Sequence, residues 1–227
     1  MNELVRVKDL VDNPTARVPV CLCLDVSGSM SGDPIQELQE GVQLFYDAVR
    51  EDTVARYAVE VCIVTFGGSA PECLSDFTGL ANQSQAPSLS AGGMTPMGEA
   101  VNMALDLLDR RKQEYKDYGV DYWQPWLVLM TDGAPNGDEG QLLHAIAKTT
   151  DLVNDKKLVV FPIGIGEDAD MDVLAKFSPK RPPLKLSGLK FREFFQWLSQ
   201  SVSKTSQSMP GERVPLDTDG IRGWAEL

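Results

Sequence analysis

Short apolar runs alternate along this chain with longer segments in which apolar residues recur every three or four positions. Uninterrupted apolar runs are typical of strands buried on both faces of a sheet, and they occupy residues 18–24, 57–66, 126–130 and 158–163. The helical period is typical of helices that pack one face on such a sheet, and it occupies residues 35–49, 97–108, 142–153 and 191–202. This alternation predicts an α/β fold with a parallel sheet and helices on both faces. A short run at 73–77 is expected to add an edge strand.

The same pattern predicts one domain. A chain of 227 residues with 43% hydrophobic content can bury a single large core. Residues 1–14 are polar and end in Asn13-Pro14, so we expect an extended N-terminal lead-in there. Residues 206–227 are rich in serine, proline, glycine and charge, so we expect a C-terminal tail. The domain itself is expected to span residues 15–205.

The formal net charge of −12 narrows the range of partners. An acidic surface repels phosphate backbones and anionic lipid, so neither nucleic acid nor a membrane is an expected partner. The N-terminus lacks an apolar signal core and no apolar stretch is long enough to span a bilayer, so we expect a cytoplasmic protein. The four cysteines lack the spacing of a zinc site and are expected to be reduced core residues.

Candidate chemistry follows the first apolar run. In Asp25-Val26-Ser27-Gly28-Ser29, one carboxylate and two hydroxyls occupy alternate positions, so their oxygens can bend toward one point as the chain leaves the sheet. Asp132 follows the run at 126–130 in the same way, and Thr95 follows a glycine-rich loop. Because ligands of open α/β sheets bind at the carboxyl ends of the strands, we expect these side chains to form one site.

This candidate site is built from oxygen alone. Two carboxylates and three hydroxyls make a weakly anionic set of ligands for a hard divalent cation. Such a set favours Mg²⁺ or Mn²⁺ in octahedral geometry over Ca²⁺, whose sites gather more carboxylates.

The three parts, Asp25-x-Ser27-x-Ser29, Thr95 and Asp132, resemble the metal-ion-dependent adhesion site (MIDAS) of von Willebrand factor A (VWA) domains. The resemblance covers roughly residues 15–205. It implies an open, doubly wound, mostly parallel sheet with one short antiparallel edge strand. It also implies that Ser27, Ser29 and one of the pair Thr95 and Asp132 bind the ion directly. Asp25 and the other member of that pair would often act through water. A partner's Asp or Glu would supply the last ligand, which makes the protein a binding module and not an enzyme.

Three loop sequences and the C-terminal sequence resemble a narrower group. Leu-Asp-Val-Ser-Gly-Ser-Met, Gly-Gly-Met-Thr-Pro-Met-Gly-Glu-Ala, Met-Thr-Asp-Gly-Ala-Pro and the ending Asp-Gly-Ile-Arg-Gly-Trp-Ala-Glu-Leu are similar to those of bacterial cytosolic TerY-like proteins, which are associated with tellurium resistance. That resemblance implies a role in stress response or phosphorylation-linked signalling, beside kinase and phosphatase partners.

Two other functions remain open at this level. Asp25 and Asp132 with Mg²⁺ could run phosphoryl transfer or hydrolysis, although no second aspartate follows Asp25 at phosphatase spacing and no phosphate-binding Gly-Lys loop or general base is evident. The other alternative is a structural scaffold in which the metal only stabilises the loops. Taken one at a time, Asp25 and Ser27 could be turn residues, and Thr95 before Pro96 could be an ordinary helix cap.

Overall fold

The computed structural model describes residues 9–83, 85–212, 214–215 and 225–226. One seven-stranded sheet runs through it in the order β3-β2-β1-β4-β5-β6-β7. The strands are β1 (Val18–Asp25), β2 (Val59–Gly67), β3 (Ala70–Gly79), β4 (Trp126–Thr131), β5 (Val159–Ile165), β6 (Leu184–Leu186) and β7 (Ala225–Glu226). Neighbours from β2 to β6 pair in parallel, so their carboxyl ends share one edge of the sheet.

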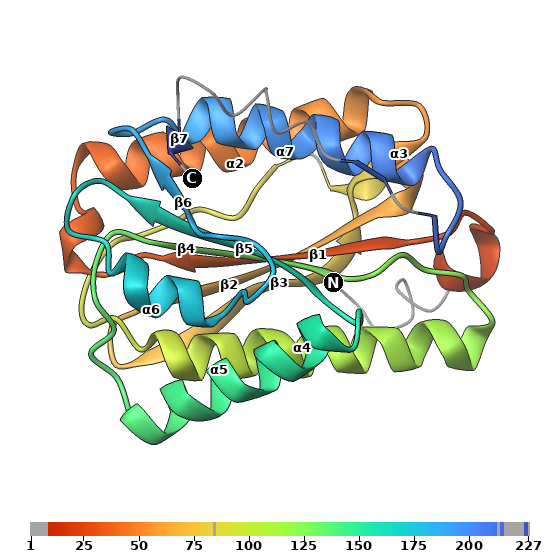
Figure 1. The fold of residues 1–227 in the computed structure, drawn as a ribbon. Helices are drawn as coiled ribbons and strands as arrows, with labels where there is room; N and C mark the ends of the chain where they lie inside the picture. The colour runs from red at the N-terminus through yellow and green to blue at the C-terminus, as the bar shows by residue number, and fades with distance from the viewer. Residues whose placement is uncertain (1–8, 84, 213, 216–224, 227) are drawn as a thin grey trace.

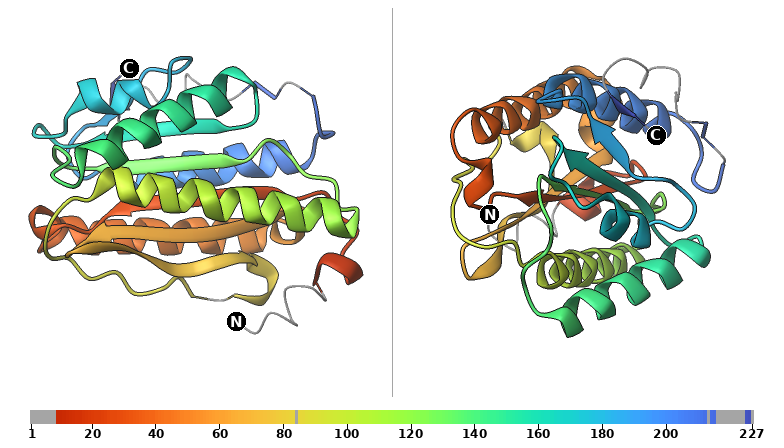
Figure 2. Two further views of the ribbon diagram at one scale, coloured as in Figure 1. Left: turned by 90° about the horizontal axis from the view of Figure 1, so that it is seen from below. Right: turned by 60° about the vertical axis from the view of Figure 1, so that its left-hand side comes forward.

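Helices cover both faces of this sheet (Figure 1; Figure 2, right). One face carries α2 (Asp33–Glu51), α3 (Ala55–Ala58) and α7 (Phe191–Ser206), and the other carries α4 (Met97–Tyr118), α5 (Glu139–Asn154) and α6 (Met171–Lys176). Two short 3₁₀ helices, η1 (Gly28–Met30) and η2 (Leu80–Asn82), lie in the loops. The predicted α/β fold with a mostly parallel sheet is therefore confirmed.

The interior strand β1 shows how one strand serves a two-sided core. Val20 and Leu22 pack with α2 and α7, whereas Cys21 and Cys23 pack with α4 and α5. Side chains of a strand alternate between faces, so an uninterrupted apolar run serves both layers at once. All four cysteines are free thiols, as expected, and Cys73 is less buried than the other three.

The edges of the sheet differ from the expectation. The antiparallel edge strand β3 extends over ten residues, not only 73–77, and β7 adds a second antiparallel strand at the opposite edge. An edge strand needs only one covered face, so the exposed or half-buried residues Ala70, Pro71 and Glu72 can belong to the strand without an apolar pattern.

Two other segments also depart from the sequence prediction. The helix α4 continues to Tyr118, beyond the predicted helical segment 97–108, because Arg111 and Tyr115 extend its buried face. Gly119 ends the helix with a positive φ of 66°. In the lead-in, residues 9–12 are helical instead of extended, and Leu10 is buried. Most of the predicted tail 206–227 lies outside the described residues.

Candidate metal centre

Asp25 ends β1 with its side chain fully buried. The backbone N–H of Ser27 donates to its Oδ1 at 2.8 Å, and the Thr131 hydroxyl donates to its Oδ2 at 2.5 Å. Burial raises the pKa of Asp25, the hydrogen bonds from Ser27 and Thr131 oppose that rise, and the nearby charge of Asp132 adds to it. In the described part of the chain no lysine or arginine forms an ion pair with Asp25, so its negative charge lacks a positive counterpart.

A chain of oxygens connects the first loop with the loop after β4. The hydroxyls of Ser27 and Ser29 lie 3.1 Å apart, and the Ser29 hydroxyl donates to Asp132 Oδ1 at 2.8 Å. Ser27 is buried, Asp132 is half-buried and Ser29 is exposed. The structure thus gathers these three predicted residues next to Asp25, with the open side of the site at Ser29 and Asp132.

The loop that carries Thr95 is bonded to the Asp25 loop through backbone hydrogen bonds. The N–H of Gly92 donates to the carbonyl of Val26 at 2.7 Å, and the N–H of Gly28 donates to the carbonyl of Gly93 at 3.1 Å. These bonds tie the Thr95 loop to the Asp25 loop, and Thr95 itself is buried. Among the described residues, no hydrogen bond joins its side chain to the other four candidates.

Glycines permit this close approach of the loops. Gly93 has a φ of +78°, and a Cβ there would lie 2.2 Å from the Cα of Gly68. A Cβ on Gly67 would lie 2.5 Å from the carbonyl oxygen of Val26. Any side chain at these positions would force the loops apart. Glycine therefore permits the backbone contact among the loops at residues 26–28, 67–68 and 92–93.

Two further residues shape the site, and sequence reasoning missed both. Thr131 holds Asp25, as described above, and Asn136 holds Thr95: the Thr95 N–H donates to Asn136 Oδ1 at 2.6 Å, and the Asn136 N–H donates to the Thr95 carbonyl at 3.2 Å. Each lies within four residues of Asp132, which is the only local signal that could have marked them.

The donor set fits a hard divalent cation. All five candidate side chains offer oxygen, and a cation of charge +2 would neutralise the two carboxylates. The described residues contain no cluster of three or more histidine, cysteine or acidic side chains that could hold a metal, so a coordination shell here would combine the two carboxylates with hydroxyls or water. This chemistry matches the serine and threonine positions of the site.

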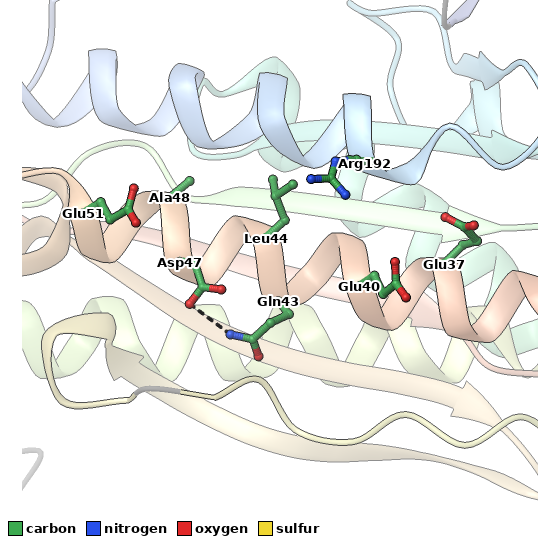
Figure 3. Close-up of a pocket in the computed structure, with 8 residues that line it drawn as sticks. All are labelled: Glu37, Glu40, Gln43, Leu44, Asp47, Ala48, Glu51 and Arg192. Atoms are coloured by element: carbon green, nitrogen blue, oxygen red, sulfur yellow. Dashed lines mark hydrogen bonds between the residues drawn. The ribbon is translucent and has the colours of Figure 1, made fainter.

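A separate surface groove of about 430 Å³ runs along α2 (Figure 3). Four carboxylates and one guanidinium line it, and Gln43 donates to Asp47 at 3.1 Å. The lining residues are Glu37, Glu40, Gln43, Leu44, Asp47, Ala48, Glu51 and Arg192. Excess negative charge makes this groove unsuitable for a phosphate ester.

Comparisons with known proteins find sequence and structural relatives of this chain. An uncharacterised protein from Synechocystis sp. is 25% identical over 176 residues, which cover 75% of this chain and 38% of the relative. A solved von Willebrand factor type A structure from Catenulispora acidiphila has a TM-score of 0.64 at 18% identity, covering 84% of this chain and 43% of that one. Proximal thread matrix protein 1 from the mussel byssus, with a zinc-occupied MIDAS motif, has a TM-score of 0.57 at 18% identity, covering 83% and 48%.

This chain spans less than half the length of each of these three relatives. The two structures share its fold, and the sequence profile of the von Willebrand factor type A domain matches residues 20–186. Because that match covers most of the chain, this protein belongs to the von Willebrand factor type A domain family.

Proposed function

We propose that this protein binds another protein through a divalent cation held by Asp25, Ser27, Ser29, Thr95 and Asp132. The observation that carries the proposal is the chain of oxygens from Ser27 through Ser29 to Asp132, beside the buried and unneutralised Asp25. Family membership supports it, because VWA domains commonly bind proteins through a MIDAS metal, and the mussel relative carries zinc in its motif.

The geometry suggests a division of roles among the ligands. Asp25 already accepts hydrogen bonds at both carboxylate oxygens, which suits a ligand that acts through water. Ser29 and Asp132 lie on the open side, where an incoming group would meet the ion. When bound, Mg²⁺ or Mn²⁺ would supply a Lewis acid for an anionic oxygen. A partner's Asp or Glu side chain is the proposed source of that oxygen.

The cellular role is proposed from sequence resemblance alone. The loop sequences and the C-terminal sequence quoted above support a place in bacterial stress response or phosphorylation-linked signalling of the tellurium-resistance type. The partners would then be kinase or phosphatase components in the cytoplasm. None of the helices in the described part of the chain has the length and apolar character of a membrane span.

A binding role is favoured over the phosphatase alternative. An attacking carboxylate must reach the phosphorus atom of its substrate, but the side chain of Asp25 is fully buried. Phosphate release from a generic phosphate ester with Mg²⁺ is the discriminating assay. Activity that Asp25→Ala abolishes would replace the binding proposal with the catalytic one.

Affinity capture tests the binding proposal. The immobilised protein is exposed to lysate of its source cells in Mn²⁺ and again in chelator. We expect one or more proteins to be retained only with the metal, and to be lost with Asp25→Ala and Thr95→Ala. The matched control is Asp151→Ala, because Asp151 is an exposed aspartate on α5 outside the proposed ligand set. Capture that chelator leaves unchanged would contradict the proposal and favour a metal that only firms the loops.

A further inference from the structure

Asn136 lies in the loop between β4 and α5, four residues beyond the candidate ligand Asp132. Its side chain accepts a hydrogen bond from the Thr95 backbone, and its own backbone N–H donates to the Thr95 carbonyl, at 2.6 and 3.2 Å. The two bonds run in opposite directions and close a ring between the residues. Asn136 therefore joins the loop that carries Thr95 to the loop that carries Asp132.

More contacts of the same kind continue along α4. Glu99 Oε1 accepts from the N–H of Asp138 at 2.9 Å, and Asn102 donates to the side chain of Gln141 at 2.8 Å. Gly137 lies between them, where a Cβ would be 2.9 Å from the Cα of Pro96. The first turns of α4 are thus attached to the whole segment 136–141, and Asn136 makes the contact nearest to the metal site.

The local sequence explains why Thr95 needs this contact. Thr95 precedes α4, which begins at Met97. The N–H groups at the start of a helix have no carbonyl partner within that helix, so the Thr95 N–H has none in α4. Because Thr95 is buried, that donor must be satisfied by another segment, and Asn136 Oδ1 supplies the acceptor.

We propose that Asn136 is a positioning residue, which holds Thr95 at the metal site by accepting its backbone N–H. The inference rests on the proposed function and deepens it, because it names a residue that sets metal affinity without touching the ion. The part of Asn136 that performs this role is its side-chain oxygen Oδ1, which accepts the hydrogen bond. Asn136 itself is exposed, so replacing it leaves the core of the domain in place.

Two variants and one control test this role in the full chain. Asn136→Ala removes the acceptor, whereas Asn136→Asp keeps an acceptor in the same position. Asn154→Ala is the matched control, because Asn154 is an exposed asparagine at the end of α5. Mn²⁺ affinity is measured from the electron paramagnetic resonance signal of the free ion, and exchange of the Thr95 amide proton is measured by NMR without metal.

We expect Asn136→Ala to weaken Mn²⁺ binding by about 10- to 100-fold, which is the usual cost of losing a group that orients a ligand. The Thr95 amide should exchange faster in the same variant. Asn136→Asp should restore both properties, and Asn154→Ala should change neither. This rescue by an acceptor distinguishes positioning from a general loss of stability.

Unchanged Mn²⁺ affinity or unchanged Thr95 exchange in Asn136→Ala would overturn the inference. If the unmodified protein binds no Mn²⁺, the proposed metal function fails by itself. The exchange measurement then still decides whether Asn136 holds the Thr95 loop: loss of protection that only aspartate restores supports it, and unaltered protection rejects it.

Discussion

The two ends of the central sheet both bury charge, but they neutralise it differently. At the amino end, Glu60 of β2 is fully buried between Arg17 and Arg111, with nitrogen–oxygen distances of 3.1 Å to Arg17 and 2.7 Å to Arg111. The Tyr115 hydroxyl donates to the same carboxylate at 2.6 Å. At the carboxyl end, Asp25 is equally buried, and within the described part of the chain its hydrogen bonds come from uncharged groups of Ser27 and Thr131.

The difference appears in the pKa values. Burial alone would lower the pKa of Arg111, but its hydrogen bond with Glu60 and the charge of that carboxylate reverse the effect, so the pKa is raised. The pKa of Asp25 is raised by burial, which disfavours its charged form. The amino end is thus an internally satisfied cluster, whereas the carboxyl end is short of positive charge. That shortage is what makes the carboxyl end suitable for a cation.

The amino-end cluster also attaches the N-terminal segment to the sheet. Arg17 donates to the backbone carbonyls of Asp9 and Asn13, at 3.2 and 3.1 Å, and to that of Thr15. One guanidinium therefore joins the described lead-in to Glu60. We interpret this end of the sheet as structural and the carboxyl end as functional.

The largest predicted effect comes from removing the buried negative charge at the amino end. Glu60→Gln leaves two buried guanidiniums facing an uncharged amide, so the free energy of unfolding should fall by about 3–5 kcal/mol. Urea denaturation measures this change. The control Asp106→Asn removes an exposed partner of Lys148 and should cost less than about 1 kcal/mol. A loss of similar size in both variants would mean that the cluster is not a special structural feature.

The next largest effect is expected when a divalent cation supplies positive charge at the carboxyl end. Mn²⁺ at about 100 times its dissociation constant should raise the free energy of unfolding by roughly 2.7 kcal/mol, because only the folded chain presents the site. Asp132→Asn should reduce this gain sharply, which calorimetric melting with and without Mn²⁺ would detect. Equal stabilisation of both proteins would place the bound ion somewhere else.

The smallest effect is expected when substitution removes the negative charge of Asp25. Because the pKa of Asp25 is higher in the folded chain than in the unfolded chain, its contribution to stability is fully present below the unfolded value and is lost as pH rises through the folded value. Asp25→Asn should therefore stabilise the metal-free protein at pH 7, by less than about 2 kcal/mol. It should also flatten the acidic part of the stability profile, measured by urea denaturation between pH 4 and pH 7.

A less stable metal-free Asp25→Asn variant at pH 7 would contradict the charge shortage. It would show that the bonds from Ser27 and Thr131 compensate fully for burial. The same variant should lose the stabilisation by Mn²⁺, so it separates the stability of the fold from the capacity to bind a metal.

Much of the architecture was predictable because each apolar run carries its own signal. The runs before Asp25 and Asp132 showed where two strands end, and parallel strands necessarily present those ends at one edge. The helix α4 was predicted too short because Arg111 and Tyr115 look like surface residues in the sequence. Their burial depends on Glu60, which lies 51 residues away from Arg111 in the sequence. A local sequence pattern cannot predict a partner at that separation.

The sequence by itself determined the alternation of the main strands and helices and the chemical types of the five candidate ligands, because both follow from local residue spacing. Only the tertiary structure decided how the site is held together. Thr131 contacts Asp25 across 106 residues and Asn136 contacts Thr95 across 41, and hydrogen bonds of this kind exist only after β1, β4 and the start of α4 have packed. The unfavourable environment of the Asp25 charge is likewise a product of folding. Water stabilises the carboxylate in the unfolded chain, and burial removes that water without supplying a positive charge.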